Sequence, residues 1–458
     1  MKNISVIILA AGEGKRMKSE KSKVLCNVLF KPMINWVLDN CKNIGCKNED
    51  ICIICPTKNE DIIKGTGNKF LYVIQKERLG TAHAIKQAHD FIINKAKDDI
   101  LILLGDVPLI SDEVLKNFCQ HHVDKENSMT VLSSNVENSF GYGRIIRDAN
   151  NNELVCKIVE EIDCSEEEKN INEINSGVMC FKKDDLLLAL DEIKNNNAKG
   201  EFYITSSIDV LLRHNKKVGV YNCNNSVEVL GANDRNQLLK LNAVAQKRVI
   251  EKLLNNGVEF VSLDGVVIGP DVKIGCGTLI YPGVILTGGT IIGKNCVITS
   301  GSNINNSIIG DYTIIKSSYI DDSTVGSSVK IGPFSNIRPN CHINDEVKIG
   351  DFVEVKNSTV SKKTSIAHLT YVGDSDVGEK VNFGCGCVTV NYDGKNKHRT
   401  VIGNNCFIGC NTNLIAPVKV ADDVYIAAGS TVTDDVPENS MCIARARQVI
   451  KKDWKFKT

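Results

Sequence analysis

Two different periods of apolar residues divide the chain. From residue 4 to about 228, short apolar runs such as SVIILA, DICIICP and DILILLGD alternate with longer stretches of helical period. Continuous apolar runs are typical of strands covered on both faces, as in a parallel sheet with crossover helices. This part of the chain, residues 1–229, is therefore predicted to be a doubly wound, Rossmann-like α/β domain.

A single long amphipathic helix is predicted to follow. In residues 233–255, apolar residues recur at steps of three and four, at Leu238, Leu241, Ala245, Val249 and Leu253. Either Asn233 or Asp234 could cap its start, and Gly257 could end it. Residues 230–255 are therefore predicted to be a linker helix between two bodies.

From residue 266 onward the apolar period becomes six. An aliphatic residue returns at each sixth position in three series: Ile268, Ile274, Ile280, Leu286, Ile292, Ile298 and Ile304; Val325, Ile331, Ile337, Ile343, Ile349 and Val355; Ile402, Ile408, Leu414, Val420, Ile426 and Val432. Neither a helix nor an ordinary strand has this period. Three six-residue faces make one coil of a left-handed parallel β-helix, with each aliphatic side chain inside the prism. This architecture is predicted for residues 256–458.

Composition and charge exclude several classes of protein. The formal net charge of the 458 residues is zero, so nothing indicates a nucleic-acid partner or an anionic membrane surface. No apolar stretch reaches the roughly 18 residues that span a bilayer. The run from Val6 to Ala11 leads into a charged loop and lacks a signal-peptide cleavage site. We expect a cytoplasmic protein with no membrane insertion.

The 18 cysteines do not suggest a disulfide scaffold, because such scaffolds are small and rich in loops. Cys52 and Cys55 lie in DICIICP, which is typical of a buried strand. Cys385 and Cys387 are too close together, without a partner pair, for a structural zinc site. We expect reduced thiols and no bound transition metal.

The loop LAAGEGKRM, residues 9–17, is a candidate anion site. It has neither the P-loop nor the dinucleotide spacing, but it joins a strand to a helical stretch, so amides and a helix dipole could face an anion. Lys15 and Arg16 add positive charge; an exposed glycine turn is the alternative. Asp106 follows a buried strand, where open α/β sheets bind ligands. It is a candidate Mg²⁺ ligand, unless it only caps a turn.

The β-helix carries residues that a pure scaffold does not need. Arg338 and Lys356 are one coil apart, so they should stack about 4.8 Å apart at the backbone. Two cations at that distance repel by roughly 3 kcal/mol, unless they splay into water or share an anion such as a sugar phosphate. His368 lies between the inward positions Ile366 and Val372, outside the prism. Residues 391–399, NYDGKNKHR, break the period and should loop out, as a lid or toward a neighbouring subunit.

Together, the first-half motifs resemble the sugar-phosphate nucleotidylyltransferases. With the six-residue repeat, the resemblance narrows to members that also carry an acetyltransferase β-helix, and it covers essentially the whole chain. It implies acetyl transfer from acetyl-CoA to glucosamine 1-phosphate, followed by uridylyl transfer from UTP to N-acetylglucosamine 1-phosphate. It also implies Mg²⁺ as cofactor and a homotrimer formed through the β-helix, with the acetyltransferase site shared between chains.

The resemblance assigns roles to residues of the first half. Arg16 and Lys23 would be catalytic, neutralising the triphosphate, and Asp106 and Asn233 would bind Mg²⁺. Leu104 departs from the Tyr that many relatives carry. UTP and the nucleotide-sugar product would be held by Leu9, Ala10, Ala11, Gly12, Lys23, Gln75, Gly80, Thr81, Leu104, Gly105, Asp106, Gly143, Glu160, Asn175 and Asn233.

In the second half, the resemblance makes His368 the general base that deprotonates the attacking amine. Cys385 and Cys410 replace the Ala and Ser of some relatives, which could make the acetyltransferase thiol-sensitive. Glucosamine 1-phosphate would be bound by Arg338, Lys356, Tyr371 and Asn382, and acetyl-CoA by Cys385, Asn391, Tyr392, Cys410, Ala428 and Arg445.

Two alternatives remain at the level of the sequence. The β-helix could serve only for oligomerisation or regulation of a sugar-phosphate nucleotidylyltransferase. The chain could also be a non-enzymatic solenoid scaffold, but LAAGEGKRM, Lys23 and Asp106 would then have no explanation.

Overall fold

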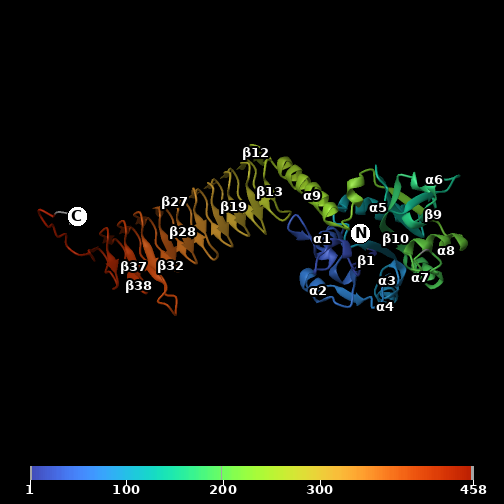
Figure 1. The fold of residues 1–458 in the computed structure, drawn as a ribbon, viewed down its shortest axis with the longest axis horizontal. Helices are drawn as coiled ribbons and strands as arrows, with labels where there is room; N and C mark the ends of the chain where they lie inside the picture. The colour runs from blue at the N-terminus through green and yellow to red at the C-terminus, as the bar shows by residue number, and fades with distance from the viewer. Residues whose placement is uncertain (1–2, 198, 455–458) are drawn as a thin grey trace. The chain divides into compact units, whose positions relative to one another are not determined.

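The computed structural model describes residues 3–197 and 199–454. Contacts divide the chain into two compact units, residues 1–245 and 246–458, which are described separately (Figure 1). Among the described residues, no helix combines the length and the apolar character needed to cross a membrane.

The first unit is built on a central sheet whose strand order is β11-β7-β10-β6-β1-β4-β5. Its central strands pair in parallel, with Val6 opposite both Ile51 and Leu101. The predicted α/β architecture is confirmed. The strands are β1 (Ile4–Leu9), β4 (Ile51–Cys55), β5 (Leu71–Ile74), β6 (Asp99–Leu104), β7 (Met129–Asn135), β10 (Glu173–Lys182) and β11 (Val218–Asn222), with β8 (Arg144–Arg147) and β9 (Val155–Val159) off this path and the small pair β2 (Asn27–Val28) and β3 (Lys31–Pro32).

Two strands of this sheet, β9 and β10, run against the prediction of a parallel sheet. β10 is antiparallel to both of its neighbours, β6 and β7, and it also pairs with β8. β8 is antiparallel to both β9 and β10, so β9 and β10 run in the same direction, and the four-residue helix α6 (Glu166–Lys169) lies between them in the chain. The reversal occurs between β8 and β9, whose connection is too short for the crossover of a dozen or more residues that a parallel pair needs. The sheet is therefore mixed.

Helices cover both faces of the sheet, which explains the continuous apolar runs. Val6 and Ile8 pack in one buried cluster with Phe118, whereas Ile7 lies in another cluster with Ile85. Successive strand residues point to opposite faces, so both must be apolar. The other helices are α1 (Met33–Asn43), α2 (Glu60–Thr66), α3 (Thr81–Lys86), α4 (His89–Asn94), α5 (Asp112–Asp124), α7 (Lys183–Glu192) and α8 (Ser207–Arg213).

The predicted long helix is α9 (Arg235–Asn255), and the boundary between the two units falls inside it. Asp234 Oδ1 accepts a hydrogen bond from the amide of Gln237 at 2.9 Å, so Asp234 caps the start. Gly257 has φ +82°, the left-handed conformation that ends many helices. Leu241 and Ala245 are buried, as the period predicted.

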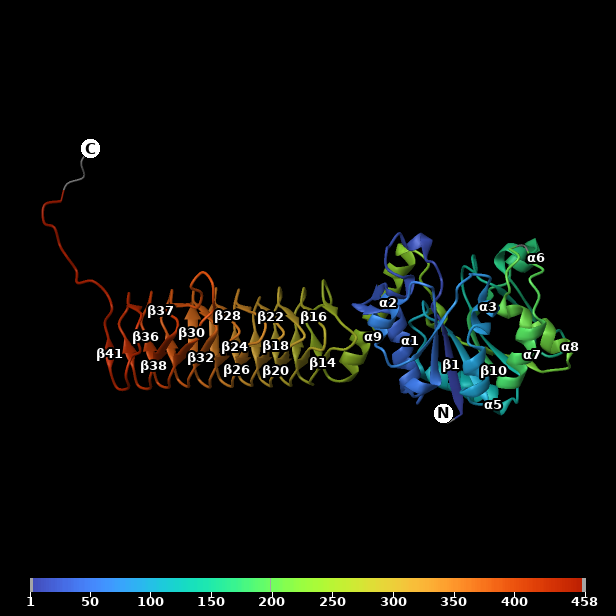
Figure 2. The ribbon, with the colours of Figure 1, turned by 90° about the horizontal axis from the view of Figure 1, so that it is seen from below.

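The second unit is a β-helix of three parallel sheets (Figure 2). The first sheet contains β12 (Glu259–Phe260), β15 (Leu279–Ile280), β18 (Val297–Ile298), β21 (Ile314–Ile315), β24 (Lys330–Ile331), β27 (Lys348–Asp351), β30 (Ser365–His368), β33 (Asn382–Phe383), β36 (Phe407–Ile408), β39 (Tyr425–Ile426) and β41 (Met441–Cys442). The second contains β13 (Val267–Ile268), β16 (Ile285–Thr287), β19 (Asn303–Asn305), β22 (Tyr319–Asp321), β25 (Asn336–Ile337), β28 (Glu354–Lys356), β31 (Tyr371–Gly373), β34 (Val388–Val390), β37 (Asn413–Ile415) and β40 (Thr431–Val432). The third contains β14 (Lys273–Ile274), β17 (Ile291–Ile292), β20 (Ile308–Ile309), β23 (Thr324–Val325), β26 (His342–Ile343), β29 (Thr359–Val360), β32 (Ser375–Val377), β35 (Thr400–Ile402) and β38 (Val418–Val420).

One aliphatic side chain per six residues fills the prism. All the aliphatic positions of the three predicted series are buried, and none is more than 8% exposed. The slip between the first two series is a local shortening of the coil, since Leu286 pairs with Ile304 but Ile304 pairs with Ile320. Across the 391–399 insertion, Val377 pairs with Ile402. The predicted hexapeptide β-helix is confirmed.

Candidate functional site

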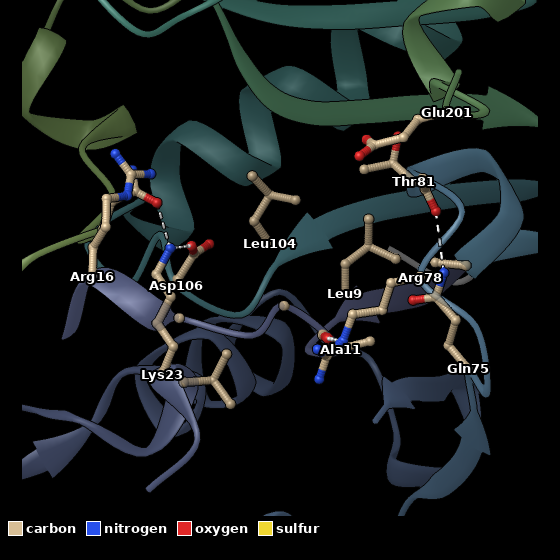
Figure 3. Close-up of a pocket in the computed structure, with 16 residues that line it drawn as sticks. Leu9, Ala11, Arg16, Lys23, Gln75, Arg78, Thr81, Leu104, Asp106 and Glu201 are labelled. Atoms are coloured by element: carbon tan, nitrogen blue, oxygen red, sulfur yellow. Dashed lines mark hydrogen bonds and ion pairs between the residues drawn. The ribbon is translucent and has the colours of Figure 1, made fainter. Parts of the chain in front are cut away.

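The first unit contains a cavity of about 430 Å³ at the carboxyl ends of β1, β5 and β6 (Figure 3). These ends lie together because β6, β1, β4 and β5 are neighbours in the sheet. Among the residues predicted from sequence, the following line the cavity: Leu9, Ala11, Gly12, Arg16, Lys23, Gln75, Gly80, Thr81, Leu104, Asp106 and Asn233. The structure thus brings together residues from five separate segments.

Lys23 joins the two predicted metal ligands. Its ammonium group donates to the carboxylate of Asp106 and, at 2.6 Å, to Oδ1 of Asn233. Lys23 is only 8% exposed, so the ion pair is well shielded from water. Two side-chain oxygens therefore already converge on one cation. A carboxylate and an amide oxygen suit Mg²⁺, which keeps water and substrate phosphates as its other ligands.

The glycine-containing loop lies over Lys23. Gly14 has φ +64°, and a Cβ on it would lie 2.7 Å from Cβ of Lys23, so only glycine allows this close approach. The expected helix after the loop is only a 3-10 turn, Lys15–Met17, which Lys18 ends at φ +48°. The helix-dipole part of the prediction is therefore wrong, because one turn has no appreciable macrodipole. The loop amides and Arg16 remain as candidate groups for binding an anion. The side chain of Lys15 lies outside the described residues.

The opposite wall contains the residues expected to bind the base. Gln75 is buried, and its Nε2 donates to the carbonyl of Gly80 at 3.2 Å. Thr81 begins α3, and its Oγ1 accepts from the amide of Ile204 at 2.9 Å. Gly80 has φ +115°, and a Cβ there would lie 2.4 Å from the carbonyl oxygen of Phe202. Packing against Phe202 thus fixes this wall.

Two charged residues of the cavity have no counterpart among the predicted ones. Arg78 and Glu201 both line it, on the wall that carries Thr81. Neither lies in a recognisable motif; only the position of Arg78 between Gln75 and Gly80 could have indicated its place.

The predicted Ala10 is buried behind the loop, and the amide of Gly105 donates to the carbonyl of Leu9 at 3.0 Å.

Three predicted residues form a second group beside the mixed part of the sheet. The amide of Asn175 in β10 donates to the carbonyl of Gly143 at 2.8 Å. A Cβ on Gly143 would lie 3.5 Å from Oε2 of Glu160, which follows β9. Burial raises the pKa of Glu160, although Thr205 donates to its carboxylate at 3.2 Å. The three residues lie together, outside the lining of the 430 Å³ cavity.

In the second unit, one corner of the β-helix carries a ladder of predicted residues. Asp351 and His368 are register partners, and the pairing of β30, β33, β36 and β39 extends the same position to Cys385, Cys410 and Ala428. The last predicted residue, Arg445, approaches Gly429 beside this ladder, its Cδ 3.6 Å from a Cβ placed there. The predicted base and most of the predicted acetyl-CoA residues thus share one corner.

His368 lies outside the prism, as predicted. Its side chain is 58% exposed, and Nδ1 lies 2.9 Å from Oδ1 of Asp351. A backbone amide and the His368 ring both hydrogen-bond Asp351, and together they hold the pKa of this carboxyl below its usual value. Asp351 therefore orients the imidazole and leaves Nε2 toward solvent, the arrangement of an oriented general base.

The predicted pair of cations stacks as expected, and a third joins it. Ile337 pairs with Val355, which places Arg338 over Lys356. Arg338 donates to Glu354 at 2.8 Å, and this bond raises its pKa. Contact with Lys397 is the main cause that lowers the pKa of Lys356. Because Lys397 comes from the 391–399 insertion, the sequence pattern did not reveal it.

The insertion also brings polar groups to the second sheet. Asn391 donates to the hydroxyl of Tyr371 at 3.4 Å and to the carboxylate of Asp374. Tyr392 and Lys397 form an isolated bridge, so the segment leaves the coil as a small hairpin, the orange loop near β28 and β30 in Figure 2. Tyr392 is 56% exposed, and Asn382 is exposed as well. Tyr371 thus contacts the insertion from β31, the strand that pairs with β28, which carries Lys356.

Comparisons with known proteins agree with this division. A family model for nucleotidyl transferases matches residues 5–226. A model for bacterial transferase hexapeptide repeats matches residues 271–306, 322–357 and 399–434.

Several curated proteins are similar over their full length. A protein named bifunctional protein GlmU from Acetivibrio thermocellus is 45% identical over 458 residues, which are 100% of this chain and 98% of that protein. Proteins of the same name are 47% identical in Clostridium kluyveri, over 98% of both chains, and in Clostridium perfringens, over 99% of this chain and 98% of the relative.

Proposed function

The chain belongs to the GlmU family of bifunctional proteins, and from this premise we propose how its two units make UDP-N-acetylglucosamine. The second unit transfers an acetyl group from acetyl-CoA to the amine of glucosamine 1-phosphate. The first unit then transfers uridylyl from UTP to the resulting N-acetylglucosamine 1-phosphate and releases pyrophosphate. Full-length identity of 45–47% to bifunctional relatives carries this conclusion.

In uridylyl transfer, an oxygen of the sugar 1-phosphate attacks the α-phosphorus of UTP. This nucleophile is already an anion, so no general base is required. The chain must instead position two polyanions and neutralise their charge. We assign neutralisation to Arg16 and Lys23, base recognition to Gln75, Gly80 and Thr81, and sugar binding to the group around Glu160.

We assign Mg²⁺ to Asp106 and Asn233, whose oxygens already converge on the ammonium of Lys23. When bound, the ion supplies charge neutralisation between the phosphates. Lys23 would give up its bond to Asp106 and remain available to the α-phosphate. Among the described residues, no group of three or more His, Cys, Asp or Glu side chains offers a different metal site.

In acetyl transfer, we assign His368 as the general base. Nε2 would take a proton from the 2-amino group as that amine attacks the thioester carbonyl. Asp351 holds the ring and stabilises the imidazolium that forms. Such a base contributes about 10²–10⁴-fold in rate.

We assign the two substrates of this step to neighbouring parts of the β-helix surface, the second sheet and the corner that follows the first sheet. Arg338, Lys356 and Lys397 would bind the sugar phosphate, since clustered cations lose their mutual repulsion when they share an anion. Tyr371 and Asn382 would contact the sugar, with Asn391 and Tyr392 completing the wall toward the cofactor. The ladder Cys385, Cys410 and Ala428, with Arg445 beside it, would bind acetyl-CoA.

We further propose that the β-helix forms the predicted homotrimer. Phe334, Phe352 and Leu369 occupy equivalent positions in successive coils, next to the His368 corner, and they are 61%, 57% and 57% exposed. The rings of Phe334 and Phe352 stack at 5.5 Å. An apolar ladder of this kind needs a partner surface. We also propose a cytoplasmic location, because UTP and acetyl-CoA are available there.

We assign residues 1–229 to the uridylyltransferase region, residues 230–255 to the linker and residues 256–458 to the acetyltransferase region.

The proposed function is tested by a one-pot assay with glucosamine 1-phosphate, acetyl-CoA, UTP and Mg²⁺, each omitted in turn. Without UTP, CoA should still be released but no nucleotide sugar should form. If the intact protein released no CoA under any condition, the β-helix would be a scaffold or regulatory domain only.

A further inference from the structure

Arg78 is a cation of the nucleotide cavity that no motif predicted. It stands on the segment between Gln75 and Gly80, and its side chain crosses to the phosphate loop. Its Nε donates to the carbonyl of Ala11 at 3.2 Å (Figure 3). Its terminal nitrogen lies 3.3 Å from Oε1 of Glu13. Arg78 therefore connects the wall assigned to the base with the loop assigned to the triphosphate.

The contact with Glu13 is one that a phosphate can replace. Both side chains are close to half exposed, 46% for Arg78 and 48% for Glu13, and pairs in that environment contribute little to stability. A guanidinium binds phosphate through two parallel hydrogen bonds, a stronger interaction than one exposed carboxylate contact. The bond to Ala11 keeps the guanidinium beside the loop while its partner changes.

The other cations of the cavity indicate which phosphates Arg78 would meet. Lys23 lies with Asp106 and Asn233, where the proposed uridylyl transfer places the α-phosphate. Arg78 approaches the cavity from the other wall and reaches the loop at Ala11 and Glu13. We place the β- and γ-phosphates, which leave as pyrophosphate, along that part of the loop.

We propose that Arg78 is a specificity-determining residue that exchanges Glu13 for the terminal phosphates of UTP and so holds the pyrophosphate leaving group. This inference rests on the proposed uridylyl transfer. It adds a contact to pyrophosphate from the segment that otherwise recognises the base, and thereby couples recognition of the two ends of the nucleotide.

The reverse reaction separates this role from a structural one. In that direction pyrophosphate and UDP-N-acetylglucosamine bind as separate substrates of the full-length protein. Arg78→Gln should raise the KM for pyrophosphate about ten-fold, the effect of losing one charge-assisted hydrogen bond. It should leave the KM for UDP-N-acetylglucosamine unchanged, and Arg78→Lys should recover part of the loss.

Controls keep the outcomes distinct. Lys58→Gln removes an exposed charge from a nearby loop that does not line the cavity, and it should change neither KM. Glu13→Gln should keep or lower the KM for pyrophosphate, because it removes the competing carboxylate. Equal increases in both KM values for Arg78→Gln would show that Arg78 merely braces the wall, and no change would also overturn the proposal. A wild-type protein without any uridylyl transfer would instead refute the proposed function.

Discussion

The two candidate sites differ in how the chain builds them. In the first unit, segments far apart in sequence converge on one cavity, and a buried lysine joins its two oxygen ligands. In the second, functional side chains stand on the outside of a repeating scaffold, and the proposed base is more than half exposed. A cavity lined by one unit can shield its substrates from water by itself, whereas a surface ladder needs a partner surface to cover it. We therefore expect uridylyl transfer to need one chain and acetyl transfer to need the proposed trimer.

Replacing His368 should give the largest effect. His368→Ala should lower acetyl transfer by about 10²–10⁴-fold and leave uridylyl transfer near wild type. CoA release and pyrophosphate release measure the two reactions separately. His342→Ala, another exposed histidine on the β-helix, is the matched control and should leave both intact. Loss of both activities in His368→Ala would indicate structural damage.

Replacing Asp106 should produce the opposite pattern. Asp106→Ala should reduce uridylyl transfer by about 10²–10³-fold, because the charge that balances the phosphates is lost. Acetyl transfer should continue. Asp106→Asn tests the charge with little change of shape, and Asp90→Ala, an exposed carboxylate on α4, is the control. Chelation of Mg²⁺ should mimic the variant in the wild type. Wild-type uridylyl transfer that survives chelation would contradict the metal assignment.

A smaller effect is expected at the stacked cations. Lys356→Ala should raise the KM for glucosamine 1-phosphate by about 10–100-fold with little change in the KM for acetyl-CoA, because one charged contact to the phosphate is removed. Lys330→Ala removes an exposed lysine from another sheet of the same scaffold and should have no effect. If Lys356→Ala instead affected only the KM for acetyl-CoA, the assignments of the sugar-phosphate site and the acetyl-CoA site would have to be exchanged.

The smallest effect concerns the pH dependence of stability. Burial raises the pKa of Glu160 above its ordinary value of 4.5, so the ionised form destabilises the folded state. The protonated form of Glu160 stabilises the folded state fully below pH 4.5. This stabilisation is lost as the pH rises through the raised pKa of Glu160 in the folded protein. Glu160→Gln should therefore raise Tm relative to wild type more at pH 7 than at pH 4. An equal difference at both values would mean that Glu160 is not perturbed in the folded protein.

The sequence predicted the positions of the elements better than the direction of two strands, β9 and β10. The hexad residues and the helix after Asp234 follow directly from the apolar period, since each burial position recurs along the chain. The antiparallel direction of β10 did not follow, because its apolar residues would look the same in either direction. The reversal occurs at the short antiparallel connection between β8 and β9, and β10 keeps the direction of β9.

For the sites, the sequence predicted residues that stand in motifs and missed those that reach a site from outside one. Asp106 could be selected because it follows a buried strand, and Lys23 because the family resemblance assigned it a role. Arg78 and Lys397 carry no pattern, and Lys397 lies in an insertion whose path the period does not define. Glu354 was also missed as the partner of Arg338.

By itself the sequence determined the two architectures, the division of the chain and most of the polar residues at each site, because periods and motifs are local properties. The tertiary structure decided which distant residues share a cation, which carboxylate orients His368 and which side chains cross from one wall of a cavity to another. These are distances between residues far apart in the chain, and only the packing of whole elements sets them.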